Sequence, residues 1–220
     1  MNASYEAIIF DLDGVLCSTD RFHYLAWKKM ADREGIYFDE TINQRLRGVS
    51  RMESLEIVLE RATRTYTDEE KEAMATDKNA YYRELLQTMG PGDMPADVRP
   101  TLDELRAKGY LLAVGSSSKN TPLILQKIGM ESYFDAVADG NDITRSKPDP
   151  EVFLLAAERL QKPPRACLVV EDAAAGIEAA ERGGFDAAGI GAAMDDPRAR
   201  FHLRSFSHLL QCLIPTHTPI

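Results

Sequence analysis

Two aspartates, Asp11 and Asp13, are the residues of this chain whose types and spacing most directly indicate chemistry. They follow a short apolar run at 7–10, which predicts a strand buried on both faces of a parallel sheet. Because side chains two positions apart in an extended segment point to the same side, both carboxylates should lie together where the strand ends. Such a pair requires a cation or a shared proton. A solvated turn completed by Gly14 would explain the same residues equally well.

Polar residues follow two later predicted strands in the same way. Ser-Ser-Ser-Lys-Asn at 116–120 follows a strand expected at 110–115, and an acidic pair follows one expected at 166–170. The carboxyl ends of parallel strands meet at one edge of a sheet, where open α/β sheets bind their ligands. The residues expected to join the two aspartates there are Ser116, Ser117, Ser118, Lys119, Asn120, Lys147, Glu171 and Asp172.

Four carboxylates at one edge would need a hard cation with oxygen ligands, and Mg²⁺ is the usual one. Lys147 and the hydroxyls and amides after Gly115 would supply donors to the same point. Such a site can hold a tetrahedral dianion. A carboxylate beside Mg²⁺ can accept a phosphoryl group, while a second carboxylate moves a proton on the attacking or leaving oxygen. The residues therefore indicate phosphoryl transfer.

Composition limits the partners and the compartment. A chain of 220 residues suits one large domain, or one domain that carries a smaller inserted one. The net charge of -9 argues against a nucleic-acid partner and against anionic membrane surfaces. The scattered Cys17, Cys167 and Cys212 favour reduced thiols in the cytosol. We expect a cytoplasmic protein and, since nothing in the sequence demands an oligomer, a monomer.

The predicted elements fall into two groups. Helices are expected at 19–33, from about residue 50 and from 68 toward 89, with almost no strand-like segment between them. A Gly-Pro linker at 90–95 follows, and beyond it strands and helices alternate. Strands are expected at 110–114, 134–138, 166–170 and 185–190, helices at 101–108, 122–129, 149–160 and 176–182, and a further strand and helix in 200–213.

This alternation implies right-handed crossovers and a parallel sheet. The expected fold class is therefore α/β, a Rossmann-like parallel-sheet core with an inserted helical cap domain. The core would be discontinuous and comprise residues 1–16 and 92–220, and the cap would comprise residues 17–91.

Four motifs resemble those of the haloacid dehalogenase superfamily: Asp-Leu-Asp-Gly at 11–14, the Ser116 region, Lys147 and Glu171-Asp172. They occur in the order of that family and on matching elements, and the cap stands in the matching position. The resemblance implies that Asp11 is a nucleophile forming an aspartyl phosphate and that Asp13 is the general acid/base. It also implies Mg²⁺ bound by Asp11, the Asp13 carbonyl and Asp172, with Glu171 close by.

Residues of the predicted cap resemble those of the sugar phosphate mutases in that superfamily. The matching residues are Thr19, His23, Trp27, the segment Arg-Gly-Val-Ser-Arg at 47–51, Lys78 and, in the core, Ser118-Lys119-Asn120. The resemblance places Thr19 at the hinge and Lys78 near the substrate. It implies a mutase that interconverts β-D-glucose 1-phosphate and D-glucose 6-phosphate through β-glucose 1,6-bisphosphate.

The position of Arg51 agrees with that reading. It stands at a predicted helix N-terminus, where anions are favoured, and with Ser118, Lys119 and Asn120 opposite it would hold a second phosphate far from Asp11. A mutase with a bisphosphate intermediate needs two phosphate sites. A phosphatase for a monophosphate needs one.

Plainer explanations stand beside these roles. His23 and Trp27 are one turn apart on an apolar face, as core residues often are, and Thr19 would also serve as a helix cap. Arg51 would also suit a surface position, and Lys78 lies in a charge-rich helix. The alternative function is a sugar- or small-metabolite phosphatase on the same scaffold. A non-enzymatic phosphometabolite sensor is disfavoured because the four motifs are intact.

Overall fold

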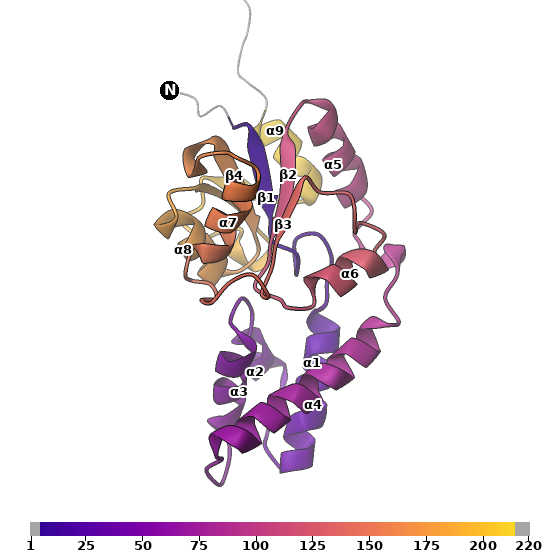
Figure 1. The fold of residues 1–220 in the computed structure, drawn as a ribbon, viewed down its shortest axis with the longest axis vertical. Helices are drawn as coiled ribbons and strands as arrows, with labels where there is room; N and C mark the ends of the chain where they lie inside the picture. Colours follow the sequence, from indigo (N-terminus) through magenta and orange to yellow (C-terminus); the bar gives the residue numbers. More distant parts are fainter. Residues whose placement is uncertain (1–4, 214–220) are drawn as a thin grey trace, which may run out of the picture.

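The computed structural model, which describes residues 5–213, is built on a six-stranded parallel sheet with strand order β3-β2-β1-β4-β5-β6 (Figure 1). The strands are β1 Ala7–Phe10, β2 Leu111–Gly115, β3 Ala136–Ala138, β4 Cys167–Glu171, β5 Asp186–Ile190 and β6 Phe201–Leu203. The predicted α/β class and the parallel sheet are confirmed.

The register of the three central strands brings the predicted motifs to one edge. Phe10 at the end of β1 pairs with Val114 of β2 on one side and with Val170 of β4 on the other. The residues that follow these positions therefore leave the sheet at the same level. Strand order reverses at β1, and open parallel sheets bind ligands at such a reversal.

Helices cover both faces of the sheet, as the continuous apolar runs of the strands require. Ile8 and Phe10 pack with residues of α5, α6 and α9, whereas Ala7 and Ile9 pack with residues of α7 and α8. These helices are α5 Val98–Ala107, α6 Thr121–Lys127, α7 Glu151–Arg159, α8 Ala174–Arg182 and α9 Leu209–Cys212. The predicted final strand and helix correspond to β6 and α9.

A group of helices is inserted between β1 and β2, below the sheet in Figure 1. They are α1 Asp20–Glu34, α2 Glu40–Gln44, α3 Arg51–Leu59 and α4 Asp68–Leu86. Trp27, Phe38, Leu55 and Met74 form a hydrophobic cluster of their own inside this insertion. Capping boxes at Ser50 and Thr67 open α3 and α4, as is typical of well-defined helix starts.

Helix α4 connects the insertion to the rest of the molecule. Met74 and Ala75 in its first half belong to the cluster of the insertion. Tyr82 and Leu86 in its second half are fully buried in the cluster that covers the sheet. Because α4 contributes to both clusters, its packing does not mark a domain boundary. The predicted division at residues 16/17 and 91/92 remains a prediction.

Some element bounds differ from the sequence expectation. The short helix α2, which Asp39 caps through the amide of Ile42, was not predicted, because its five residues are too few to show a helical period. Helix α5 begins at Val98 and not at 101, since Pro100 is accommodated in its first turn. No helix within residues 5–213 has the length and apolar character needed to cross a membrane.

The packing of α7 against the sheet gives a first testable prediction. Phe153 of α7 is fully buried, whereas its neighbour Leu154 is 40% exposed. Phe153→Ala should lower the free energy of unfolding by about 3–5 kcal/mol, since it leaves a cavity in the core. Leu154→Ala should change it by less than about 0.5 kcal/mol. Urea denaturation measures both, and equal losses would contradict this picture of the core.

Candidate active site

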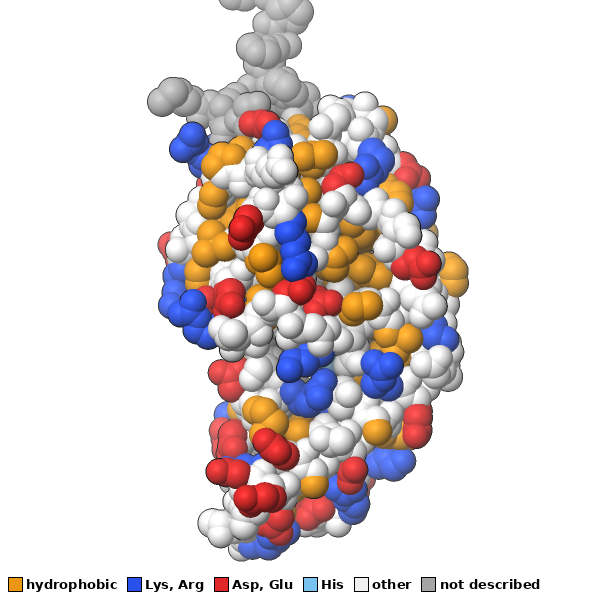
Figure 2. Space-filling view, viewed as in Figure 1, with side chains coloured by type: hydrophobic (Ala, Val, Ile, Leu, Met, Phe, Trp, Pro, Cys, Tyr) orange, Lys and Arg blue, Asp and Glu red, His pale blue; other side chains and the backbone are white. Residues whose placement is uncertain are grey.

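A cavity of about 700 Å³ lies between the edge of the sheet and the inserted helices. Figure 2 shows basic side chains gathered on the viewed face where these two parts meet. Every site residue predicted from the sequence lines this cavity: Asp11, Asp13, Thr19, His23, Trp27, Arg51, Lys78, Ser116, Ser117, Ser118, Lys119, Asn120, Lys147, Glu171 and Asp172. The fold thus brings all of them together.

Lys147 lies between two carboxylates at the sheet end of the cavity. Its Nζ is 2.5 Å from Asp11 Oδ1 and 2.8 Å from Glu171 Oε2, and its side chain is only 2% exposed. Burial alone would lower the pKa of Lys147, but the negative charges of Asp11 and Glu171 outweigh burial and raise it. Lys147 therefore remains positively charged and holds both carboxylates in place.

One lysine does not balance the acidic groups at this end. Carboxylate oxygens of Asp11, Glu171 and Asp172 lie within 4.8 Å of one another. Burial, followed by the charges of Glu171 and Asp11, raises the pKa of Asp172 to about 8. Burial also raises the pKa of Glu171, although Lys147 acts against it. Such a buried excess of negative charge fits a metal site with oxygen ligands.

Glycines make room for these carboxylates. A Cβ at Gly14, whose φ is +84°, would lie 2.0 Å from Asp172 Oδ2. A Cβ at Gly176 would lie 2.0 Å from Glu171 Oε2. Glu171 Oε1 also accepts the backbone N–H groups of Asp172 and Ala173, so Glu171 fixes the loop that carries Asp172.

Asp13 is bound by the residue that precedes the first inserted helix. The Thr19 hydroxyl donates a hydrogen bond to Asp13 Oδ1 and does not cap α1. Loss of hydration and then the charge of Asp11 raise the pKa of Asp13 to about 7, although Thr19 opposes the shift. A carboxyl group with a pKa near neutrality is suited to give and take a proton.

On the side of the cavity formed by the inserted helices, Lys78 is surrounded by rings. Its Nζ is 3.0 Å from His23 Nδ1, 4.5 Å from the centre of the Trp27 ring and 4.8 Å from that of Tyr82. Burial, then Lys78 and Arg51, lower the pKa of His23, so that its ring is neutral and accepts a hydrogen bond from Lys78. Trp27 is both a core residue of the insertion and part of the cavity wall.

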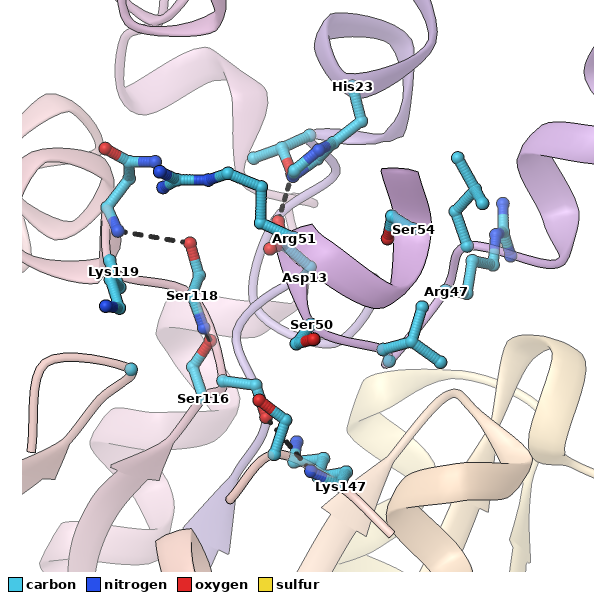
Figure 3. A pocket seen from close by; sticks show the side chains of 18 of the residues that line it. Asp13, His23, Arg47, Ser50, Arg51, Ser54, Ser116, Ser118, Lys119 and Lys147 are labelled. Carbon is cyan, nitrogen blue, oxygen red and sulfur yellow. Dashed lines mark hydrogen bonds between the residues drawn. The ribbon is translucent and has the colours of Figure 1, made fainter. Parts of the chain in front are cut away.

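Three cations that line the cavity have no acidic partner among the described residues. Among residues 5–213, no carboxylate lies within salt-bridge distance of Arg51, Lys78 or Lys119. Arg51 extends from α3 toward the side of the cavity formed by Ser118 and Lys119 (Figure 3). Burial lowers the pKa of both Arg51 and Lys78. An anion between these groups would remove their mutual repulsion.

The structure adds residues that the sequence reasoning did not select. Arg47 lies 2.9 Å from Asp20 Oδ2 and 4.0 Å from Asp172 Oδ2, so that it links the insertion to the acidic cluster. The Tyr82 hydroxyl is buried and has no hydrogen-bond partner within residues 5–213. The family resemblance of the segment 47–51 was the sequence feature that could have indicated Arg47. No sequence pattern distinguishes Tyr82 from an ordinary core residue.

Fold and site together define the class of protein. Residues 5–184 match the family of haloacid dehalogenase-like hydrolases. The chain belongs to that family, as its four motifs predict, and is therefore an enzyme of hydrolysis or phosphoryl transfer.

Individual relatives divide between two activities. The chain is 39% identical over 188 residues to the β-phosphoglucomutase of Bacillus subtilis, with 84% of this chain and 83% of that protein covered. It is 33% identical over 184 residues, with 82% of each covered, to a phosphorylated carbohydrates phosphatase of Thermotoga maritima. The crystal structure of a β-phosphoglucomutase from Clostridium difficile matches with a TM-score of 0.87 and 36% identity over 93% of both chains.

The acidic cluster gives a prediction that combines metal and pH. The folded pKa of Asp172 is about 8, above the usual value of about 3.9, so metal-free protein should lose stability as pH rises from about 4 to about 8. Asp172→Asn should remove part of that loss and be more stable than the wild type at pH 8 without metal. Mg²⁺ should then raise the melting temperature of the wild type far more than that of the variant.

Thermal melts with chelator and with Mg²⁺ measure both effects. Asp32→Asn, which changes an exposed aspartate of α1, is the matched control and should show the wild-type response to Mg²⁺. If Asp172→Asn gains as much from Mg²⁺ as the wild type does, Asp172 is not a metal ligand.

Proposed function

We propose that this enzyme is a β-phosphoglucomutase, which interconverts β-D-glucose 1-phosphate and D-glucose 6-phosphate through β-glucose 1,6-bisphosphate. The observation that carries this proposal is the separation of charge in one cavity. The sheet side of the cavity holds Asp11, Asp13, Glu171 and Asp172 around Lys147. Elsewhere in the cavity wall, Arg51, Lys78 and Lys119 form no salt bridge with any carboxylate of residues 5–213. With a divalent cation bound at the sheet end, a ligand with a phosphate at each end would be attracted to both.

The proposed chemistry begins at Asp11. A carboxylate oxygen of Asp11 attacks phosphorus, so that an O–P bond to Asp11 forms while the bond from phosphorus to the sugar oxygen breaks. Lys147, 2.5 Å from Asp11, keeps this carboxylate oriented and balances part of its charge. Asp13 gives its proton to the departing sugar oxygen, and in the second half-reaction it takes a proton from the attacking hydroxyl.

The acidic cluster fits Mg²⁺, which we propose is held by Asp11, the Asp13 carbonyl and Asp172, with Glu171 close by. When bound, Mg²⁺ neutralises charge on the transferring phosphoryl group. Residues of the chain position the reacting groups: the Thr19 hydroxyl donates a hydrogen bond to Asp13, and Glu171 accepts one from the backbone N–H of Asp172.

The side of the cavity toward which Arg51 extends would hold the phosphate that does not react. Arg51 and Lys119 supply the positive charge there, and Ser118 supplies a hydroxyl, while Lys78 lies nearby in the cavity wall. The bisphosphate then turns over, so that each phosphate occupies each end once in a cycle. Inserted helices that cover the sheet edge exclude water and direct the phosphoryl group to the sugar.

The comparisons support this proposal and also its alternative. The Bacillus subtilis relative is a β-phosphoglucomutase, whereas the Thermotoga maritima relative is a phosphatase of phosphorylated carbohydrates. A sugar- or small-metabolite phosphatase would use the same Asp11 and Asp13, with water in place of the second sugar hydroxyl. In both cases the partner is a small sugar phosphate.

Product analysis separates the two reactions. The enzyme is given β-glucose 1-phosphate, Mg²⁺ and a trace of β-glucose 1,6-bisphosphate, and glucose 6-phosphate and inorganic phosphate are both followed. Glucose 6-phosphate with little inorganic phosphate is the result expected of a mutase. Release of mostly inorganic phosphate would establish the phosphatase instead.

A substitution at Arg51 tests the second phosphate site. Arg51→Ala should lower kcat/KM for mutase turnover by about 10- to 100-fold, the loss expected for a hydrogen-bonded charged contact. Hydrolysis of a small acyl phosphate, which has no second phosphate, should change much less. Arg61→Ala, at an exposed arginine just after α3, is the control. Equal loss of both activities in Arg51→Ala would remove the argument for two phosphate sites.

Proton uptake on ligand binding tests the role of Lys78 in binding a phosphate. Burial, followed by Arg51, lowers the pKa of Lys78 to about 7, from about 10.4 in an unfolded chain. Lys78 is therefore mostly neutral at pH 8.5, and a bound dianion should raise its pKa and draw in a proton. Calorimetry of glucose 6-phosphate binding to metal-free enzyme, in buffers of different ionisation enthalpy, measures that uptake. Uptake that persists in Lys78→Met would assign the proton to another group.

A further inference from the structure

Two residues of helix α4, in the insertion, hold the side-chain amide of Asn120. Asn120 Nδ2 donates to Asn79 Oδ1 at 2.9 Å, and Arg83 Nη1 donates to Asn120 Oδ1 at 3.0 Å. Asn120 is only 5% exposed. Both ends of its amide are therefore occupied by residues of the inserted helices, and the arginine donor fixes which end is the oxygen.

The two partners of Asn120 belong to one stripe of α4. Asn79 and Arg83 are four residues apart, so that they lie one above the other on the helix surface. Gln87, four residues further on, accepts a hydrogen bond through its carbonyl from Lys127 Nζ at 3.3 Å. Lys127 is the last residue of α6, and Asn120 directly precedes that helix, so α4 and the residue that follows it contact both ends of the α6 segment. Figure 1 shows α4 passing beside α6.

Asn120 is also joined to the loop that precedes it. Its backbone N–H donates to Ser118 Oγ, and the Ser118 N–H donates to Ser116 Oγ, each at 3.2 Å. The Thr121 hydroxyl donates to the Ser118 carbonyl at 2.8 Å. A displacement of Asn120 therefore shifts Ser118 and Lys119, which lie on the side of the cavity toward which Arg51 extends (Figure 3).

We propose that Asn79 and Arg83 are positioning residues that tie the phosphate-facing loop 116–120 to helix α4. The contacts of Asn79 and Arg83 with Asn120 are called here the Asn120 clasp. Through the clasp, loop 116–120 takes its phosphate-binding form only while the inserted helices cover the sheet edge. Binding of the unreactive phosphate then favours the covered state, because both depend on the same residue.

The effect on products rests on the proposed function. With the clasp intact, the phosphoryl group of the aspartyl phosphate passes to the sugar hydroxyl. With the clasp broken, water reaches the aspartyl phosphate. A water oxygen then bonds to phosphorus, the bond from phosphorus to Asp11 breaks, and the water proton passes to Asp13. The products are free Asp11 and inorganic phosphate.

The clasp is not what holds α4 to the rest of the fold. Tyr82 and Leu86 on the same helix are fully buried in the hydrophobic cluster over the sheet. Arg83 by contrast is exposed, and Asn79 is partly exposed at the cavity wall. Substitutions at these two positions should therefore leave the fold in place, and melting temperatures verify this.

Four variants and one control test the clasp. Asn79→Ala and Arg83→Ala remove the contacts, whereas Asn79→Asp keeps an acceptor for the Asn120 amide and Arg83→Lys keeps a donor. Lys71→Ala is the control, because Lys71 on the same helix pairs with Glu56 of α3, at 2.7 Å, inside the insertion. The first measurement is hydrogen exchange of the segment 116–127 in the full chain with Mg²⁺.

Exchange of 116–127 should rise by about fivefold in each alanine variant, the factor expected for loss of one hydrogen bond. It should stay near the wild-type rate in Asn79→Asp, in Arg83→Lys and in Lys71→Ala. Wild-type exchange in both alanine variants, or an equal rise in Lys71→Ala, would overturn the clasp. This readout needs no activity, so it remains decisive even if the enzyme proves to be a phosphatase.

The second measurement is the ratio of inorganic phosphate to glucose 6-phosphate. It should rise by about fivefold in the alanine variants and return toward the wild-type ratio in the conservative ones. Raised exchange with an unchanged ratio would reject the clasp as a determinant of product. A wild-type enzyme that forms no glucose 6-phosphate would instead reject the proposed function and leave the exchange result to decide the clasp.

Discussion

The buried contact of Lys147 with Asp11 and Glu171 is the interaction on which the rest of the site depends. A lysine that is 2% exposed is tolerated only because two carboxylates compensate its lost hydration. The sheet supplies this geometry, since β1 and β4 are adjacent and in register at Phe10 and Val170. Bringing a third and fourth carboxylate to the same edge then creates a surplus of negative charge that an added cation relieves.

A surplus of positive charge lies in the cavity wall formed by the inserted helices. Arg51 and Lys78 are partly or fully removed from water and face no carboxylate of residues 5–213 within salt-bridge distance. Repulsion of this kind destabilises the folded chain, and perturbed charged groups in a cleft are typical of ligand-binding sites. A divalent cation at the acidic end would make both parts of the pocket attractive to anionic groups.

Much of this could be predicted from the sequence, because strands buried on both faces are continuous apolar runs and their carboxyl ends share one edge. This logic places Asp11 and Asp172 in one site, and the charge of Lys147, just before a predicted helix, predicts that it joins them. Contacts between the insertion and the sheet could not be predicted in this way. Asn120 bonds to Asn79 and Arg83, and Thr19 bonds to Asp13 instead of capping α1. Both arrangements depend on how the inserted helices lie over the sheet, and no local sequence pattern specifies that.

Thr19 links the inserted helices directly to Asp13 through a short segment of the chain. Only five residues separate Asp13 from Thr19, and α1 begins at the next position. Any rotation of α1 therefore moves the hydroxyl that holds Asp13, and Arg47 adds a second link from Asp20 of α1 toward Asp172. In the proposed mechanism, the cover that excludes water and the carboxyl that moves the proton are positioned by the same short segment. Closure of the cavity and readiness of Asp13 are then one event, which favours transfer to a sugar over transfer to water.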